Sequence, residues 1–254
     1  MISNWVNSKK HHTVISKHNE VLEQMSKADK EEERKNAEKY NESLSESAIP
    51  IEDPFADNAS SDNVMDSSYF NVLNIGETMG SIEIPSINVN LPIYHGISDD
   101  VLQEGIGHMS NSSFPVGGLG SHTALTGHRG LPSSKLFRDL DKVKNDDVFL
   151  IHTLDDTLAY KIDDIQIVLP NETSWLNIVP DKDYVTLITC EPYMINTHRL
   201  LVRGERIPYV EEIAFQHVER QNDRSILKWI LAGTLILFIT IIIVYNRKKA
   251  LVEG

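Results

Sequence analysis

Short apolar runs separated by polar turns fill the middle of the chain, between Gly80 and Val210. Several of these runs alternate apolar and polar positions, which is typical of β-strands with one buried face. The pattern predicts strands over 81–84, 89–94, 121–126, 147–151, 159–169, 184–189 and 199–207. Only one short helix is predicted in this region, near 133–140. Many short strands with few helices favour a mainly β fold, either a closed barrel or a sandwich, over a parallel α/β sheet.

Two polar segments precede the strand region. Residues 13–46 carry one thin apolar stripe at helical spacing, so residues 1–46 are predicted to form an N-terminal polar helical region. Residues 47–68 are rich in Ser, Asp, Asn and Pro without periodicity, and we assign 47–79 to a loop and linker. An aromatic residue, Phe55, stands out in this polar loop, where its simplest role is to pin the loop to the surface.

A long apolar stretch without charges lies near the C-terminus, from Trp229 to Tyr245. Residues 226–245 would form about 30 Å of helix, which matches the thickness of a bilayer core. We therefore expect a transmembrane helix over 226–245, a juxtamembrane helix over 211–225 and a tail over 246–254. Basic residues flank the two ends of the stretch equally, so charge alone does not orient it.

The beginning of the chain leaves the orientation open as well. Residues 1–20 contain no apolar run long enough for a signal peptide or a membrane anchor. Two interpretations remain: a tail-anchored protein whose larger part faces the cytosol, or a chain whose true N-terminus is missing from this sequence.

Composition removes several classes of function. The chain has 24 Lys and Arg against 37 Asp and Glu, and this net charge of −13 argues against non-specific nucleic-acid binding. The single cysteine, Cys190, excludes an internal disulfide and any metal site built from several thiolates.

Cys190 is also the first candidate for chemistry, because it ends an apolar strand and opens a turn. A thiol needs a neighbouring base or cation to react at neutral pH. Among the ten histidines, His128 stands in a similar place, at the end of a predicted strand and before a turn. Arg199 begins the strand after the cysteine, so a hairpin would bring its positive charge back to the thiol, where it could stabilise an oxyanion. The alternatives are a buried packing cysteine and a surface arginine.

Two segments carry a family resemblance. T-L-I-T-C-E-P-Y-M-I-N-T-H-R-L-L-V-R-G-E-R, from Thr186 to Arg206, resembles the active-site signature of sortases. F-P-V-G-G-L-G-S-H-T-A-L-T-G-H-R-G-L-P-S-S-K-L-F-R-D-L-D, from Phe114 to Asp141, resembles the histidine segment of the same family. The residues of both segments are similar to those of the class C, or pilin-polymerising, sortases. The apolar stretch over 226–245 resembles the second membrane anchor of that class.

A third segment, Asp53-Pro54-Phe55, resembles the Asp-Pro-aromatic lid motif of class C, with Phe where many relatives have Trp. The resemblance implies that Asp53 pairs near Arg199 and that Phe55 packs over Cys190. The smaller ring is expected to favour the closed state less.

For the rest of the chain, the resemblance implies an eight-stranded sortase-type β-barrel over 80–210 and a cysteine transpeptidase activity. Cys190 would be the nucleophile, His128 the general acid and base, and Arg199 the group that stabilises the oxyanion or the substrate. No metal and no organic cofactor are expected.

The implied partners are pilin subunits that carry sorting signals of the Leu-Pro-x-Thr-Gly type and an acceptor lysine. The barrel would lie outside the cell, held at the membrane by the C-terminal span, with an N-terminal signal or anchor missing from this sequence. Two alternatives remain: a cysteine hydrolase that releases its product to water, and a non-catalytic membrane-anchored interaction module.

Overall fold

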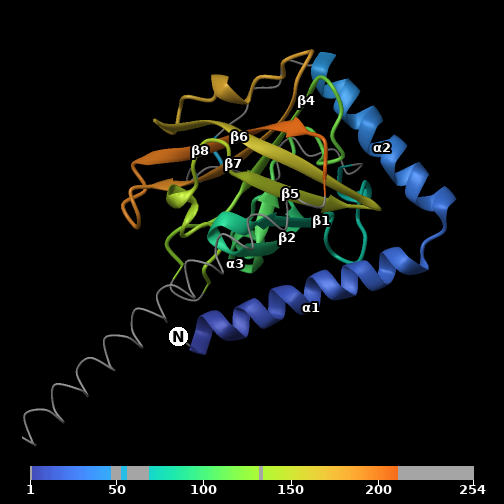
Figure 1. The fold of residues 1–254 in the computed structure, drawn as a ribbon, viewed down its shortest axis with the longest axis horizontal. Helices are drawn as coiled ribbons and strands as arrows, with labels where there is room; N and C mark the ends of the chain where they lie inside the picture. The colour runs from blue at the N-terminus through green and yellow to red at the C-terminus, as the bar shows by residue number, and fades with distance from the viewer. Residues whose placement is uncertain (1, 47–52, 56–68, 132–133, 211–254) are drawn as a thin grey trace, which may run out of the picture. The chain divides into compact units, whose positions relative to one another are not determined.

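Eight strands form a closed barrel in the part of the chain that the computed structural model describes, namely residues 2–46, 53–55, 69–131 and 134–210. The strands are β1 (Gly80–Ile84), β2 (Val89–His95), β3 (Ile106–His108), β4 (Ser121–Thr126), β5 (Val148–Thr153), β6 (Asp156–Val168), β7 (Asp183–Glu191) and β8 (His198–Ile207). Around the barrel they follow the order β1-β2-β3-β4-β7-β8-β6-β5, and β5 closes on β1 (Figure 1). The mainly β, eight-stranded barrel that the sequence implies is therefore confirmed.

Two strand pairs in this barrel are parallel, β2 with β3 and β4 with β7, and the remaining pairs are antiparallel. The parallel pairing of β4 with β7 matters for function. Parallel neighbours end at the same rim of a sheet, so residues that follow β4 and β7 leave the barrel side by side.

Short elements of the barrel region differ from the sequence prediction. β3 and the helix α3 (Asp99–Glu104) were not predicted, and the helix expected near 133–140 is wrong. Residues 136–139 form turns, and only a 3-10 helix, Leu140–Lys142, follows. The amide of Phe137 donates a hydrogen bond to the carbonyl of His128 at 3.2 Å, so the backbone here is tied to the end of β4 and not to a preceding helical turn. The other 3-10 helices are Tyr69–Asn71, Pro85–Ile87 and Ser174–Leu176.

Alternate residues of the strands face two different apolar layers. Val185 and Leu187 of β7 belong to the large core, which fills the barrel interior. Ile188, in contrast, belongs to a smaller cluster that also contains Phe55 and Trp175. Because successive side chains of a strand point to opposite faces, this smaller cluster lies on the outer face of the barrel wall.

The N-terminal polar region forms two helices, α1 (Ile2–Gln24) and α2 (Lys27–Glu46), with a break at residues 25–26 that the apolar stripe does not indicate. Ser26 lies between them and begins α2 with a reciprocal cap. Its Oγ accepts a hydrogen bond from the amide of Asp29 at 3.1 Å, and its own amide donates to the Asp29 carboxylate at 3.3 Å.

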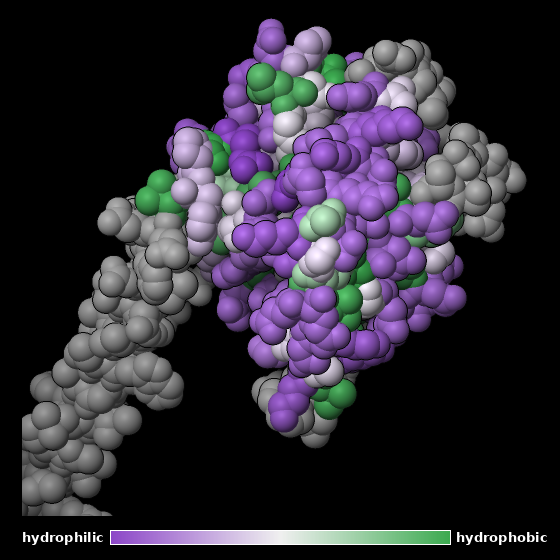
Figure 2. All heavy atoms as spheres, turned by 90° about the vertical axis from the view of Figure 1, so that its right-hand side faces the viewer, coloured by the Kyte–Doolittle hydropathy of each residue, from purple (hydrophilic) through white to green (hydrophobic). Residues whose placement is uncertain are grey.

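Both helices run along the outside of the barrel (Figure 1). In α1, the buried His18 donates to the carbonyl of Ile75 at 2.7 Å. In α2, Lys30 forms an ion pair with Asp155 at 2.6 Å, which ties the helix to the turn between β5 and β6. The face of the molecule on which α2 lies is mainly hydrophilic (Figure 2), as expected for a polar helix with one thin apolar stripe.

The C-terminal predictions fall outside the described residues. These are the juxtamembrane helix over 211–225, the transmembrane helix over 226–245 and the tail over 246–254. None of the helices in the described part of the chain is long and apolar enough to cross a bilayer. The chain divides into two units, Met1–Tyr209 and Val210–Gly254. All the strands and helices of the described structure belong to the first unit.

Candidate active site

Cys190 and Arg199 lie directly opposite each other on β7 and β8. Directly opposite residues of an antiparallel pair place their side chains on the same face, so the hairpin brings the guanidinium to the thiol as the sequence predicted. Both residues are buried, each with 5% of its surface exposed. Cys190 follows Ile188 with the same alternation, so the thiol lies on the outer face of the barrel wall and not in the interior.

His128 reaches the same rim from the neighbouring strand. The parallel ladder of β4 and β7 ends with the amide of Gly127 donating to the carbonyl of Ile188 at 3.1 Å. The hydroxyl of Thr189 then donates to the carbonyl of Gly127 at 2.7 Å. The next residue on each strand is His128 or Cys190, so the imidazole and the thiol extend from adjacent strand ends.

The segment Asp53–Phe55 covers this rim. Both oxygens of the Asp53 carboxylate accept hydrogen bonds from Arg199, at 2.6 Å from Nε and 2.6 Å from Nη2. The ring of Phe55 lies 5.6 Å from the ring of His128, centroid to centroid, and 5.1 Å from the guanidinium carbon of Arg199. Pro54 between them is buried. A segment far away in the sequence thus engages the arginine and the histidine together.

The protonation states of the thiol and the imidazole follow from their burial. Burial raises the pKa of Cys190 from 9.0 to about 11; the charge of Arg199 lowers it and the charge of Asp53 raises it further. Burial also lowers the pKa of His128, against a smaller opposing effect of Asp99. Both shifts favour the uncharged forms, so the thiol and the imidazole are both neutral at neutral pH.

One buried arginine next to this site was missed by the sequence analysis. Arg129 follows His128, and its side chain is 7% exposed. Its guanidinium forms ion pairs with Glu191, the residue after Cys190, and with Asp141 at 2.9 Å. The only available signal was the position of Arg129 directly after a candidate histidine.

Arg203, the other arginine on the Arg199 face of β8, takes no part in the site. It pairs with Asp163 at 2.7 Å, and its guanidinium carbon lies 4.4 Å from the ring centroid of Tyr184. Among the described residues, no group of three or more His, Cys, Asp and Glu side chains is arranged to hold a metal ion.

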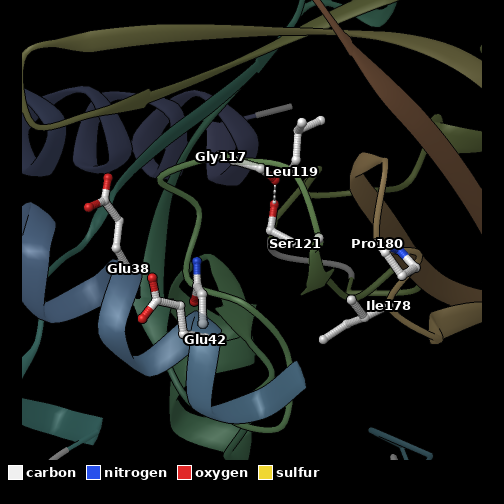
Figure 3. Close-up of a pocket in the computed structure, with 10 residues that line it drawn as sticks. Glu38, Glu42, Gly117, Leu119, Ser121, Ile178 and Pro180 are labelled. Carbon is white, nitrogen blue, oxygen red and sulfur yellow. Dashed lines mark hydrogen bonds between the residues drawn. The ribbon is translucent and has the colours of Figure 1, made fainter. Parts of the chain in front are cut away.

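A cavity of about 590 Å³ lies elsewhere on the molecule, between α2 and the loop before β4 (Figure 3). Glu38 and Glu42 of α2 line it together with the loop of Gly117 and Leu119. A 2.6 Å hydrogen bond from the Ser121 hydroxyl to the carbonyl of Gly118 holds the backbone of this loop. This loop precedes β4, whereas His128 follows it. The cavity is therefore at the opposite end of the strand from the candidate catalytic residues.

The sequence of the chain is similar to known proteins of one family. A family model described as the sortase domain matches residues 82–207. Among curated proteins, the chain is 30% identical over 135 residues to sortase D of Bacillus subtilis (strain 168) and 31% identical over 132 residues to sortase A of Streptococcus agalactiae serotype III (strain NEM316). These matches cover 52% and 50% of this chain, and 65% and 52% of the two relatives, so the chain spans only part of their length.

Solved structures match over a larger share. Streptococcus pneumoniae sortase C superposes with a TM-score of 0.71 and 46% identity, covering 78% of this chain and 97% of that one. Streptococcus agalactiae sortase C1 gives a TM-score of 0.73 and 39% identity, covering 80% of this chain and 98% of that one. Sortase C-1 of Actinomyces oris gives a TM-score of 0.67 and 46% identity, covering 71% of this chain and 99% of that one. With the barrel, the matched domain and these near-complete class C structures in agreement, the chain belongs to the sortase family, in its class C.

Proposed function

We propose that this chain is a cysteine transpeptidase that joins pilin subunits. It would cleave a sorting signal of the Leu-Pro-x-Thr-Gly type between Thr and Gly and pass the acyl group to a lysine amine of another pilin. One observation carries the proposal: Cys190, His128 and Arg199 converge at one rim from β7, β4 and β8. The relatives support the substrate class, since S. pneumoniae sortase C has pilin substrates and a Group B Streptococcus sortase C is pilus-related.

The first half of the reaction forms a thioester. His128 first accepts the proton of the Cys190 thiol. The resulting thiolate attacks the carbonyl carbon of the threonine, so a carbon–sulfur bond forms and the carbonyl electrons move to oxygen. Arg199 donates hydrogen bonds to this oxyanion. As the oxyanion collapses, the carbon–nitrogen bond breaks and protonated His128 gives its proton to the leaving glycine amine.

The second half transfers the acyl group. A lysine amine attacks the thioester, His128 accepts a proton from that amine, and the carbon–sulfur bond breaks to restore Cys190. A covalent intermediate divides one amide exchange into two easier acyl transfers. Water competes with the lysine at this stage, so a covered site favours transfer over hydrolysis.

Asp53 and Phe55, with Pro54 between them, form the lid in this proposal. While Asp53 accepts both hydrogen bonds from Arg199, the guanidinium does not face an incoming oxyanion. Phe55 lies against the His128 ring, which must instead reach the leaving amine. The lid therefore has to move before substrate binds, and its movement exposes the thiol and takes away the charge that raises its pKa.

The proposed location is the cell membrane, with the barrel outside and the stretch over 226–245 as the span. This part rests on the sequence pattern and on the family, whose members attach to cell surfaces. Protease treatment of whole cells should remove the barrel and leave the residues after the span protected. Protection of the barrel would contradict this orientation.

The activity is tested by product analysis. Residues 2–210 are incubated with a sorting-signal peptide, with and without a lysine-bearing pilin acceptor, and the products are identified by mass spectrometry. We expect an amide between the threonine and the lysine, and no cleavage by Cys190→Ala. Release of the free acid alone, even with acceptor present, would indicate a hydrolase. Cleavage by the alanine variant would remove Cys190 from the mechanism.

A further inference from the structure

Arg129 is a buried charge next to the candidate catalytic residues, and it pairs with two carboxylates. Its guanidinium forms ion pairs with Glu191 and with Asp141, and its Nε donates to the carbonyl of Arg138 at 3.3 Å. Only 7% of the Arg129 side chain and 20% of the Glu191 side chain are exposed. A charge buried this far needs its partners, since an unpaired buried charge is strongly destabilising.

The position of this pair along the two strands is its most informative feature. Beyond the backbone ladder of β4 and β7, the hydroxyl of Thr189 donates to the carbonyl of Gly127 and joins the two strand ends. His128 and Cys190 come next, and among the described residues no hydrogen bond joins these two to each other. Arg129 and Glu191 then join the two chains again. The imidazole and the thiol are thus held between two links, one on each side.

The pair lies on the other face of the wall from the chemistry. In β7, side chains of Val185 and Leu187 point to the interior, and the same alternation carries Glu191 to that side. Cys190 points to the outer face with Ile188. The ion pair therefore does not meet a substrate that approaches the thiol.

We propose that Arg129 and Glu191 are positioning residues that fix the distance and orientation of His128 relative to Cys190. The inference rests on the proposed function, in which the imidazole must exchange a proton with the amine nitrogen that leaves or attacks the carbonyl carbon bonded to the Cys190 sulfur. Without the second link, the ends of β4 and β7 separate beyond Gly127 and Thr189. A misplacement of about 1 Å can reduce an enzymatic rate by about 100-fold.

Asp141 makes it possible to remove the Arg129–Glu191 contact without leaving the arginine unpaired. In Glu191→Gln the guanidinium of Arg129 keeps its ion pair with Asp141, so the arginine stays paired and the barrel is expected to fold. What is lost is the charged contact between the two strand ends. Arg129→Lys gives the complementary change, because it keeps the charge and loses the fork that reaches two carboxylates at once.

The test compares steady-state transpeptidation by wild type, Glu191→Gln, Glu191→Asp, Arg129→Lys and the double variant Arg129→Lys with Glu191→Gln. We expect kcat to fall 10- to 100-fold in Glu191→Gln, as a misplaced general acid requires, with KM within about twofold of wild type. Glu191→Asp should recover part of kcat. The double variant should be no slower than the slower single variant, because both changes break one link.

The matched control is Arg203→Ala, which breaks the partly buried ion pair with Asp163 elsewhere on β8. It should lower the melting temperature at least as much as Glu191→Gln while leaving kcat unchanged. A kcat of Glu191→Gln within twofold of wild type, or no lower than that of the control, would overturn the inference. So would a rise in KM alone, since it would place Glu191 in substrate binding. If wild type itself forms no product, the proposed function fails instead.

Discussion

Both carboxylate oxygens of Asp53 accept hydrogen bonds from the guanidinium of Arg199, each at 2.6 Å. Their side chains are 10% and 6% exposed, so this is a largely desolvated, two-pronged ion pair. It joins a loop before the barrel to the strand opposite the candidate nucleophile. Burial is the main cause of the raised pKa of Cys190, and the charge of Asp53 adds to it, so the carboxylate that pairs with Arg199 also favours the protonated thiol.

Replacing Asp53 with Ala should make Cys190 more reactive. The substitution removes a charge that raises the thiol pKa and leaves Arg199, which lowers it, so the thiolate fraction at neutral pH rises. We expect labelling of Cys190 by an alkylating reagent to become roughly tenfold faster, since one pKa unit is a factor of ten in thiolate. Asp163→Ala, which releases Arg203, is the control and should label at the wild-type rate. Equal rates for Asp53→Ala and wild type would show that this segment does not restrain the thiol.

Replacing Phe55 with Ala should act in the same direction by a different cause. The ring contacts His128 and Arg199, and aromatic and cation–π contacts of this kind contribute about 0.5–1.5 kcal/mol each. Their loss should increase the labelling rate of Cys190 by a few-fold to about tenfold. Phe70→Ala, at an exposed aromatic, serves as the control. A rate as slow as that of wild type would mean that Phe55 does not cover the site.

Arg199→Lys should separate charge from geometry. Lysine keeps the positive charge near Cys190 but does not offer two parallel donors, so it holds neither Asp53 nor an oxyanion in the same way. We expect kcat/KM to fall by about 100-fold, the effect of losing one oxyanion donor. Arg203→Lys should stay near wild type. An active Arg199→Lys would assign Arg199 an electrostatic role only.

Cys190 should make the free energy of unfolding depend on pH in alkaline solution. Its pKa is about 11 in the folded protein against an ordinary 9.0, so the folded state keeps the proton after the unfolded chain has lost it. This contribution is fully present below pH 9 and is lost as the pH rises through 11. Urea unfolding of wild type and Cys190→Ser at about pH 8 and about pH 10 should show wild type losing stability relative to the variant. A difference that does not change with pH would contradict the buried, protonated thiol.

The sequence predicted the strands that alternate and the residues that end them. β4, β7 and β8 are visible as apolar runs, and Cys190, His128 and Arg199 stand at their ends. The three residues of β3 are too few for a period, and α3 is only a short capped turn. Ser26 and Asp29 form a capping signal that was present in the sequence and was overlooked.

Contacts between distant segments could not be read from patterns. The Asp53–Arg199 pair was expected only through the family resemblance, and the Arg129–Glu191 pair was not expected at all. Periodicity reports which face a residue takes within its own strand, whereas these ion pairs depend on which strand ends and loops meet in space.

The most direct test of the account is the mass of the enzyme after reaction with substrate. Asp53→Ala, with the lid contact removed, is mixed with a sorting-signal peptide, quenched in acid and analysed by intact mass and peptide mapping. We predict an added acyl fragment ending at threonine on the peptide that contains Cys190, and its disappearance when a lysine-bearing acceptor is added. An adduct on another residue, or no adduct at all while the thiol labels rapidly, would contradict the account.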